Sequence, residues 1–115
     1  MGGSVEARVV EIKELDRKQT KIEISGTCVS ACTLYLGAHN TCVKPNARLG
    51  FHGPSSALRG IPLVPREFDR VSMMMADYYP PKIRAWFLAK ARYVFEDYIT
   101  ISGRQAIEMG AKPCS

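Results

Sequence analysis

Residues 26–37 read GTCVSACTLYLG, a run that is almost entirely small or apolar. From Cys28 to Leu36 this composition predicts a buried helix, and Gly37 suits the left-handed conformation that commonly ends a helix. Ser30 would then lie in the first turn. Serine is a common cap residue, and its small size also suits tight packing, so its position alone does not make it a nucleophile.

The residues before this run predict a helix followed by a strand. The apolar face of an amphipathic helix is formed by side chains three and four positions apart, here Val5, Val9, Ile12 and Leu15. Residues 21–24 then read KIEI, an alternation that suits a strand with one buried face, and Gly26 ends it.

After Gly37 the sequence predicts two short strands and a loop. The strands are expected at 41–43 and 48–51, and the second delivers His52 to its carboxyl end. Residues 53–64 contain two Gly, two Pro and two Ser, which predicts the longest loop of the chain.

The last part of the chain predicts two helices, a strand and a short helix. Pro65 can begin a helix that stops at Pro80-Pro81, and a second helix is expected from 81 to about 92. The apolar stripe of the first one is formed by Phe68, Val71, Met75 and Tyr78. Residues 98–101 predict a strand, and 102–105 match a capping box that opens a helix ended by Gly110. The expected fold class is therefore α/β, in one domain over residues 1–115.

Composition excludes several classes of function. The net charge is +5, but the 16 Lys and Arg are scattered and form no basic cluster, so we expect no nucleic-acid partner. No run of eighteen apolar residues occurs, which predicts no membrane span. No Cys-x-x-Cys pair is present, so we expect no metal and no cofactor.

The four cysteines allow two disulfides or four buried thiols, and their number does not decide between these states. Cys28 and Cys32 are four residues apart, and helix geometry does not readily bring such a pair close enough for a bridge. We therefore expect both to be small buried apolar side chains.

Two residues could form a nucleophile and base pair. His52 lies at a strand end beside Gly53-Pro54, where a side chain can face a cleft, whereas His39 lies in a turn and is expected to be solvated. A serine nucleophile needs a base to take its proton and N–H groups to hold the oxyanion. The N–H of Ala31 and the glycine pair Gly2-Gly3 are candidates for the oxyanion donors.

Five segments, taken in order, resemble ClpP and related ClpP-like serine peptidases. They are GGSV at 2–5, GTCVSA at 26–31, PNAR at 45–48, HGP at 52–54 and SGRQAIEMG at 102–110. In that family a Gly-Gly oxyanion loop precedes the first helix, a serine follows a strand within a small-residue segment, and a histidine closes a later strand before a proline. The resemblance maps these roles to Gly3, Ser30 and His52.

The resemblance implies a ClpP/crotonase-like fold of stacked β-β-α units that acts on a peptide or protein substrate. It also implies a homo-oligomer, with the stripe of residues 68–78 as the candidate contact, while an ATPase partner stays open. The Cys-x-Ser-x-Cys pattern around Ser30 is similar to bacterial ClpP-like proteins that are often periplasmic. A periplasmic location is therefore implied, although the first residues lack the pattern of a signal peptide.

The chain departs from the family pattern at its acid and at its start. Ungapped alignment puts Tyr98 where the family has the acid, and Asp97, one residue earlier, would need a bulge or a shifted register to reach His52. Asp97 is thus the expected third member of the triad, or else a solvated acid beside Glu96. Family members also have strands before the Gly-Gly loop, so we expect a fragment or an N-terminally truncated variant with an exposed sheet edge.

Two other classes of function stay open. A non-catalytic pseudopeptidase or assembly module of the same fold is favoured by the misplaced acid and by the missing strands. A crotonase-type enzyme that acts on an acyl-CoA thioester would share the oxyanion loop but has less need of a Ser-His pair.

Overall fold

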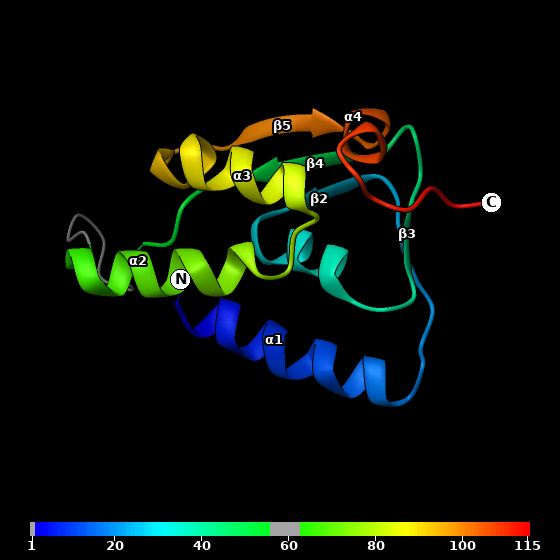
Figure 1. Ribbon diagram of the computed structural model, residues 1–115, viewed down its shortest axis with the longest axis horizontal. Helices are drawn as coiled ribbons and strands as arrows, with labels where there is room; N and C mark the ends of the chain where they lie inside the picture. The colour runs from blue at the N-terminus through cyan, green and yellow to red at the C-terminus, as the bar shows by residue number, and fades with distance from the viewer. Residues whose placement is uncertain (1, 56–62) are drawn as a thin grey trace.

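The computed structural model describes residues 2–55 and 63–115, which form a mixed α/β globule (Figure 1). Most of the loop expected at 53–64 therefore lies outside the described residues. The elements follow one another in the order α1 (Gly2–Arg17), β1 (Ile22–Ile24), β2 (Thr27–Val29), η1 (Ser30–Gly37), β3 (Thr41–Val43), β4 (Arg48–Phe51), α2 (Pro65–Ala76), α3 (Pro81–Ala89), η2 (Ala91–Tyr93), β5 (Ile99–Ser102) and α4 (Gly103–Glu108).

The strands form two small sheets that are joined by their connecting residues. β1 pairs with β3 in parallel, and β4 lies between β2, its parallel partner, and β5, its antiparallel partner. The N–H of Lys44 donates to the Ile24 carbonyl at 2.9 Å, and the N–H of Arg48 donates to the Gly26 carbonyl at 2.8 Å. The pairing thus continues from one sheet into the next.

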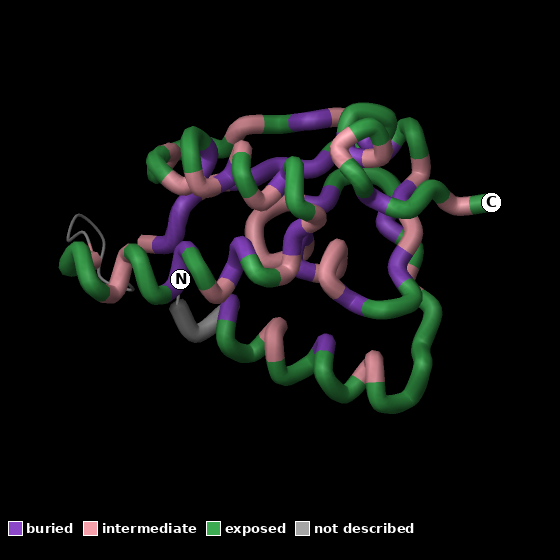
Figure 2. Tube along the Cα trace, in the orientation of Figure 1, coloured by how far each residue is buried: buried purple, intermediate pink, exposed green. Residues whose placement is uncertain are grey.

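Helices cover the strands on several sides. In Figure 1, α1 runs along the lower side of the molecule, and η1 lies between it and the strands. α3 packs on β4 through Phe51, whose ring meets Trp86 and Tyr79 edge-on with centroids 5.1 and 5.3 Å apart. Buried residues concentrate along the strands and on the helix faces that point toward them (Figure 2). One apolar core therefore lies beneath β2 and β4.

The run at 28–36 differs from the expected helix. Its first residues form strand β2, and the helix that follows is a 3₁₀ helix that begins at Ser30 and includes Gly37. Cys28 is drawn into the sheet because β2 pairs with β4, with Cys28 opposite Leu49. Gly37 does not end the helix in a left-handed conformation but allows close packing, since a Cβ there would lie 2.7 Å from the backbone of Tyr78.

Both pairs of cysteines are disulfides, so the expectation of buried thiols at Cys28 and Cys32 is wrong. Because Cys28 ends up on a strand and Cys32 on the following helix, their Cα atoms are 5.3 Å apart, within the usual range of a bridge. The second disulfide joins Cys42 on β3 to Cys114 near the C-terminus. There the N–H of Cys114 also donates to the Val43 carbonyl, at 3.0 Å.

The stripe proposed as an oligomer contact is used inside the chain. Val71 and Met75 are each only 2 % exposed, and Phe68 and Tyr78 are half-buried. Val71 and Met75 belong to the core, so this stripe offers little surface to a second copy. Two of its four side chains thus face the protein's own interior, and the expected homo-oligomer stays a prediction.

The other expected elements are confirmed with small shifts. α2 ends at Ala76, before Pro80, and α3 ends at Ala89. The capping box is present: the N–H of Gln105 donates to the Ser102 hydroxyl at 3.0 Å, and the Gln105 side-chain Oε1 accepts from the N–H of Ser102 at 2.8 Å. Within residues 2–55 and 63–115, no helix has the length and apolar character needed to span a membrane.

Candidate active site

Ser30 lies at a sharp junction between strand β2 and helix η1. Its φ is 63°, in the left-handed region that side chains disfavour. Gln19 is the other described non-glycine residue with a positive φ, and it lies just after the end of α1, where that conformation is common. Ser30 instead begins a helix directly after a strand, an arrangement that also occurs at the strained turn of the nucleophilic serine in α/β hydrolases.

The strand register brings Ser30 and His52 to the same edge of the sheet. β2 and β4 run parallel with Val29 opposite Gly50, so both strands end side by side. Ser30 directly follows the first strand, and His52 directly follows the second. Since neighbouring strands lie about 4.8 Å apart, the two residues occupy one small region at the carboxyl edge.

The imidazole of His52 is oriented by a backbone carbonyl. Its Nδ1 lies 2.8 Å from the carbonyl oxygen of Gly53, and because a carbonyl can only accept, Nδ1 carries the proton. In the neutral ring Nε2 is then the unprotonated nitrogen. This is the tautomer that a general base needs if Nε2 is to take the proton of a serine.

Gly53 is itself held in place by the segment after α3. Its N–H donates to the Val94 carbonyl at 2.8 Å, and a Cβ at this position would collide with the Arg92 carbonyl. A glycine is needed for this close approach. The carbonyl that orients His52 therefore belongs to a fixed piece of backbone.

No hydrogen bond joins the Ser30 hydroxyl to His52 within the described part of the chain. His52 is half-buried, as is Ser30. Hydrogen bonds between catalytic groups are often long in the absence of substrate and tighten in the reacting complex. The arrangement thus brings Ser30 and His52 to one edge of the sheet without a preformed hydrogen bond between them.

Asp97 is exposed and turned to its own backbone. One carboxylate oxygen accepts from the N–H of Tyr98 at 2.8 Å, and no described hydrogen bond joins Asp97 to His52. Phe51 pairs with Ile99, but Gly53 bonds to Val94, so the residues between these two partners leave the ladder. This excursion carries Asp97 away from the strand, and Gly53 supplies the orienting oxygen instead.

The two expected oxyanion donors are in different situations. Ala31 is the second residue of η1, so its N–H has no acceptor inside that helix. Gly3 lies within the first turn of α1, so the expected Gly-Gly loop is the start of a helix. Arg8, whose guanidinium contacts Ala31, comes five residues later on α1, so Gly3 lies about 7.5 Å from the Arg8 backbone along the helix axis.

Helix α1 is fastened to η1 by a small charged cluster. The Arg8 guanidinium donates to the Ala31 carbonyl at 3.2 Å, lies 4.4 Å from the centroid of the Tyr35 ring, and forms an ion pair with Glu11 at 2.8 Å. The Tyr35 hydroxyl in turn donates to Glu11 at 2.8 Å. Burial and the hydrogen bond to Glu11 both raise the pKa of Tyr35. The first turn of η1 is thus held from outside as well as from the core.

Sequence reasoning missed three contributors around Ser30. The Cys28–Cys32 disulfide encloses Ser30 in a five-residue loop. The hydroxyls of Thr33 and Tyr79 form a buried chain to the Ser30 carbonyl. The Ser-x-x-Thr spacing was a local signal for Thr33, but Tyr79 is 46 residues farther along the chain and only the fold brings it near.

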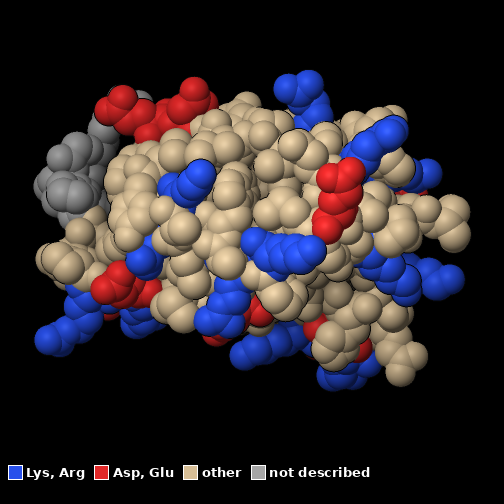
Figure 3. All heavy atoms as spheres, turned by 45° about the horizontal axis from the view of Figure 1, so that its top comes forward, with Lys and Arg blue, Asp and Glu red and all other residues tan. Residues whose placement is uncertain are grey.

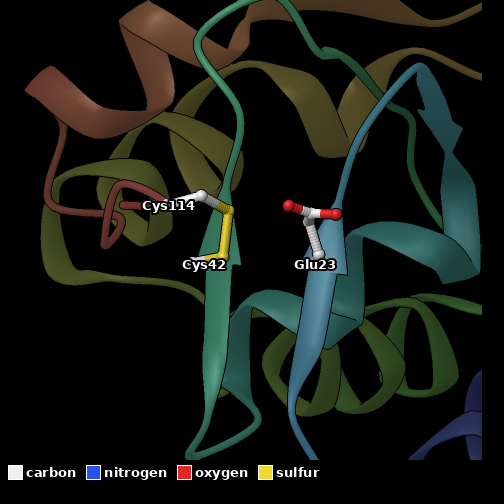
Figure 4. Close-up of side chains that lie close together, drawn as sticks. All are labelled: Glu23, Cys42 and Cys114. Atoms are coloured by element: carbon white, nitrogen blue, oxygen red, sulfur yellow. A yellow bond between two sulfur atoms is a disulfide. The ribbon is translucent and has the colours of Figure 1, made fainter.

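A second cluster of metal-binding residue types lies away from this edge. Glu23, Cys42 and Cys114 bring their ligand atoms within 4.8 Å of one another, beside a groove that also touches Lys21 and Lys112. Figure 4 shows the two sulfurs joined to each other, with the Glu23 carboxylate facing them from β1. Since thiolates are the sulfur ligands of metals, a disulfide leaves a single carboxylate there, which does not make a metal site.

On the face seen in Figure 3, the charges of the described residues are mixed. In Figure 3, Lys and Arg side chains are interspersed with Asp and Glu. Several are paired across one or two turns of helix, for example Arg17 with Glu14 at 2.6 Å and Arg70 with Glu67 at 2.7 Å. In comparisons with known proteins, no protein-family model matches the chain, and no curated protein matches it.

Proposed function

We propose that this protein is a ClpP-like serine hydrolase with a Ser30 nucleophile and a His52 base. The Ser30 oxygen would attack a peptide or ester carbonyl while His52 Nε2 takes its proton. The N–H of Ala31 would hold the oxyanion that forms. His52 would then return the proton to the leaving group, and water would release the acyl group from Ser30.

The observation that carries this proposal is the φ of 63° at Ser30. A non-glycine residue in this conformation costs about 1 kcal/mol or more, so a folded chain keeps it only where the surroundings impose it. The nucleophile elbow is a known use of such strain, because the tight turn pushes the serine oxygen out of the sheet edge and leaves helix N–H groups beside it. A serine that merely began a 3₁₀ helix would have a negative, right-handed helical φ, since the extended cap position before η1 is taken by Val29.

The proposal assigns the third role to the Gly53 carbonyl rather than to Asp97. A carbonyl oxygen can fix the tautomer and orientation of an imidazole, as it does for many functional histidines. It stabilises the imidazolium less than a carboxylate does, because it carries only a partial charge. We therefore expect a slower hydrolase than one with a complete Ser-His-Asp triad.

A ClpP/crotonase-like fold and an oxidising compartment belong to the same proposal. The fold is supported by the order of the elements and by the parallel pairing of β2 with β4. The compartment is supported by the two disulfides, which persist in oxidising environments such as the periplasm.

A non-catalytic module of the same fold is the second candidate. It is favoured by the exposed position of Asp97 and by the lack of a described hydrogen bond between Ser30 and His52. Such a module would keep the elbow without turnover. The two functions differ in one property, which is whether Ser30 can be acylated.

A burst assay with p-nitrophenyl acetate tests the proposal. The expected result is a rapid release of up to one p-nitrophenolate per chain, followed by a slower steady rate, because acylation precedes deacylation. His52→Ala should lower the burst rate by about 10²- to 10⁴-fold, the usual contribution of a general base. His39→Ala is the matched control and should leave the burst unchanged, since the His39 side chain is 79 % exposed. Linear release without a burst, or equal rates in wild type and His52→Ala, would favour the non-catalytic module.

A further inference from the structure

The carbonyl of Ser30 is held by a chain of two buried hydroxyls. The Thr33 hydroxyl donates to the Ser30 carbonyl at 2.6 Å, and the Tyr79 hydroxyl lies 2.8 Å from the Thr33 hydroxyl oxygen. Thr33 is fully buried and Tyr79 is 6 % exposed. These two hydrogen bonds therefore link Tyr79, shortly after α2, through the core to Ser30.

The direction of donation in this chain is fixed by counting protons. A threonine hydroxyl has one proton, and in Thr33 it is used on the Ser30 carbonyl. Tyr79 must then donate to Thr33. Burial raises the pKa of Tyr79, so its phenol keeps this proton throughout the physiological pH range.

Holding the Ser30 carbonyl also sets the direction of the Ala31 N–H. The two groups belong to one peptide unit, which is planar and trans, so they point in opposite directions. The carbonyl points inward to Thr33. The N–H of Ala31 is therefore turned away from the buried hydroxyls.

We propose that Thr33 and Tyr79 are positioning residues that orient the Ser30–Ala31 peptide, so that the N–H of Ala31 can act as the oxyanion donor. This inference rests on the proposed hydrolase function. It adds that the oxyanion site is supported from the core through two side chains that never touch the substrate.

A purely structural role for Thr33 is the alternative to be tested. Serine and threonine hydroxyls often bond to a carbonyl three or four residues earlier in a helix without any function. In this protein a second hydroxyl is involved. Tyr79, from a remote segment, bonds to the Thr33 hydroxyl, and Thr33 in turn donates to Ser30, the residue with the positive φ. A valine would fill the same space as Thr33 without donating a hydrogen bond. The variant Thr33→Val therefore removes the hydrogen bond to Ser30 while it keeps the packing.

The test compares burst rates with p-nitrophenyl acetate in Thr33→Val, Thr33→Ser and Tyr79→Phe. Thr33→Val should slow acylation by at least about tenfold, since a misplaced oxyanion donor costs about 10- to 10³-fold. Thr33→Ser keeps the hydroxyl and should stay within about threefold of wild type, and Tyr79→Phe should lie between these two. Ile83→Val is a destabilised control in a fully buried position outside the chain of hydroxyls, and its burst rate should be unchanged.

A spectroscopic measurement separates failure of this inference from failure of the hydrolase proposal. The carbonyl ¹³C shift of Ser30 and the amide ¹⁵N shift of Ala31 should move in Thr33→Val and return in Thr33→Ser. A wild-type chain without a burst would overturn both the hydrolase proposal and the catalytic role of the two hydroxyls. A normal wild-type burst with an unchanged rate in Thr33→Val would overturn the positioning role alone, as would a loss that Thr33→Ser fails to restore.

Discussion

Replacing Ser30 by alanine is expected to abolish the acylation burst, and replacing it by glycine should do the same while giving a more stable protein than the alanine variant. Both changes remove the nucleophilic oxygen. They differ in strain, because glycine populates positive φ freely and alanine does not, and Ser30 has a φ of 63°. We expect Ser30→Gly to exceed Ser30→Ala in free energy of unfolding by about 1 kcal/mol.

The sign of this difference is the informative result. In ordinary strand or helix positions glycine is less stable than alanine by about 0.5–1 kcal/mol. Urea unfolding of the two variants, followed by circular dichroism, measures the difference directly. The variants Ser25→Gly and Ser25→Ala serve as the control, because Ser25 is exposed and has no positive φ. There the alanine variant should be more stable than the glycine variant. If the Ser30→Gly variant is less stable than the Ser30→Ala variant, the claim that Ser30 has a strained positive φ is wrong.

Removing the Cys42–Cys114 disulfide is expected to cause the largest loss of stability. The bridge joins residues 72 positions apart, so it restricts a large part of the unfolded chain. The chain-entropy relation gives about 4 kcal/mol for a loop of this size, compared with about 2 kcal/mol for the five-residue loop between Cys28 and Cys32. The Cys42→Ala/Cys114→Ala variant should therefore be much less stable than the Cys28→Ala/Cys32→Ala variant.

Urea unfolding of both double variants tests this order, with the oxidised and the reduced wild type measured beside them. Reduction should lower the free energy of unfolding by more than either variant does alone. The Cys42→Ala/Cys114→Ala variant should keep its burst rate when it is folded, because that bridge lies away from Ser30. Equal losses of stability in the two double variants would contradict the account of loop size.

The elements that could be predicted from sequence are those with a strong local signal. The alternation at 21–24 and the capping box at Ser102 are local patterns, and both are confirmed. The segment at 28–36 has no such pattern, because a short run of small apolar residues suits a strand or a buried helix equally well. Its pairing with β4 decided that Cys28 belongs to a strand, and this pairing is a tertiary effect.

The candidate site was predictable in part for the same reason. His52 follows a predicted strand, but Ser30 was expected in the first turn of a helix, and strand β2, which ends beside it, was not predicted. The role of Gly53 depends on a backbone carbonyl, which carries no sequence signal, and the excursion that removes Asp97 depends on the bond from Gly53 to Val94. Disulfide pairing and the contact of Tyr79 with Thr33 likewise depend on residues that meet only in the folded chain.

The most direct test of an activated Ser30 is labelling of the folded wild-type chain with a fluorophosphonate, followed by intact mass and peptide mapping. The tryptic peptide of residues 22–48 contains both Ser25 and Ser30, so fragmentation of this peptide compares the exposed serine with the serine of the elbow. The account predicts one adduct per chain, located on Ser30 and lost in His52→Ala. An adduct on Ser25, or no adduct on a folded chain, would contradict it.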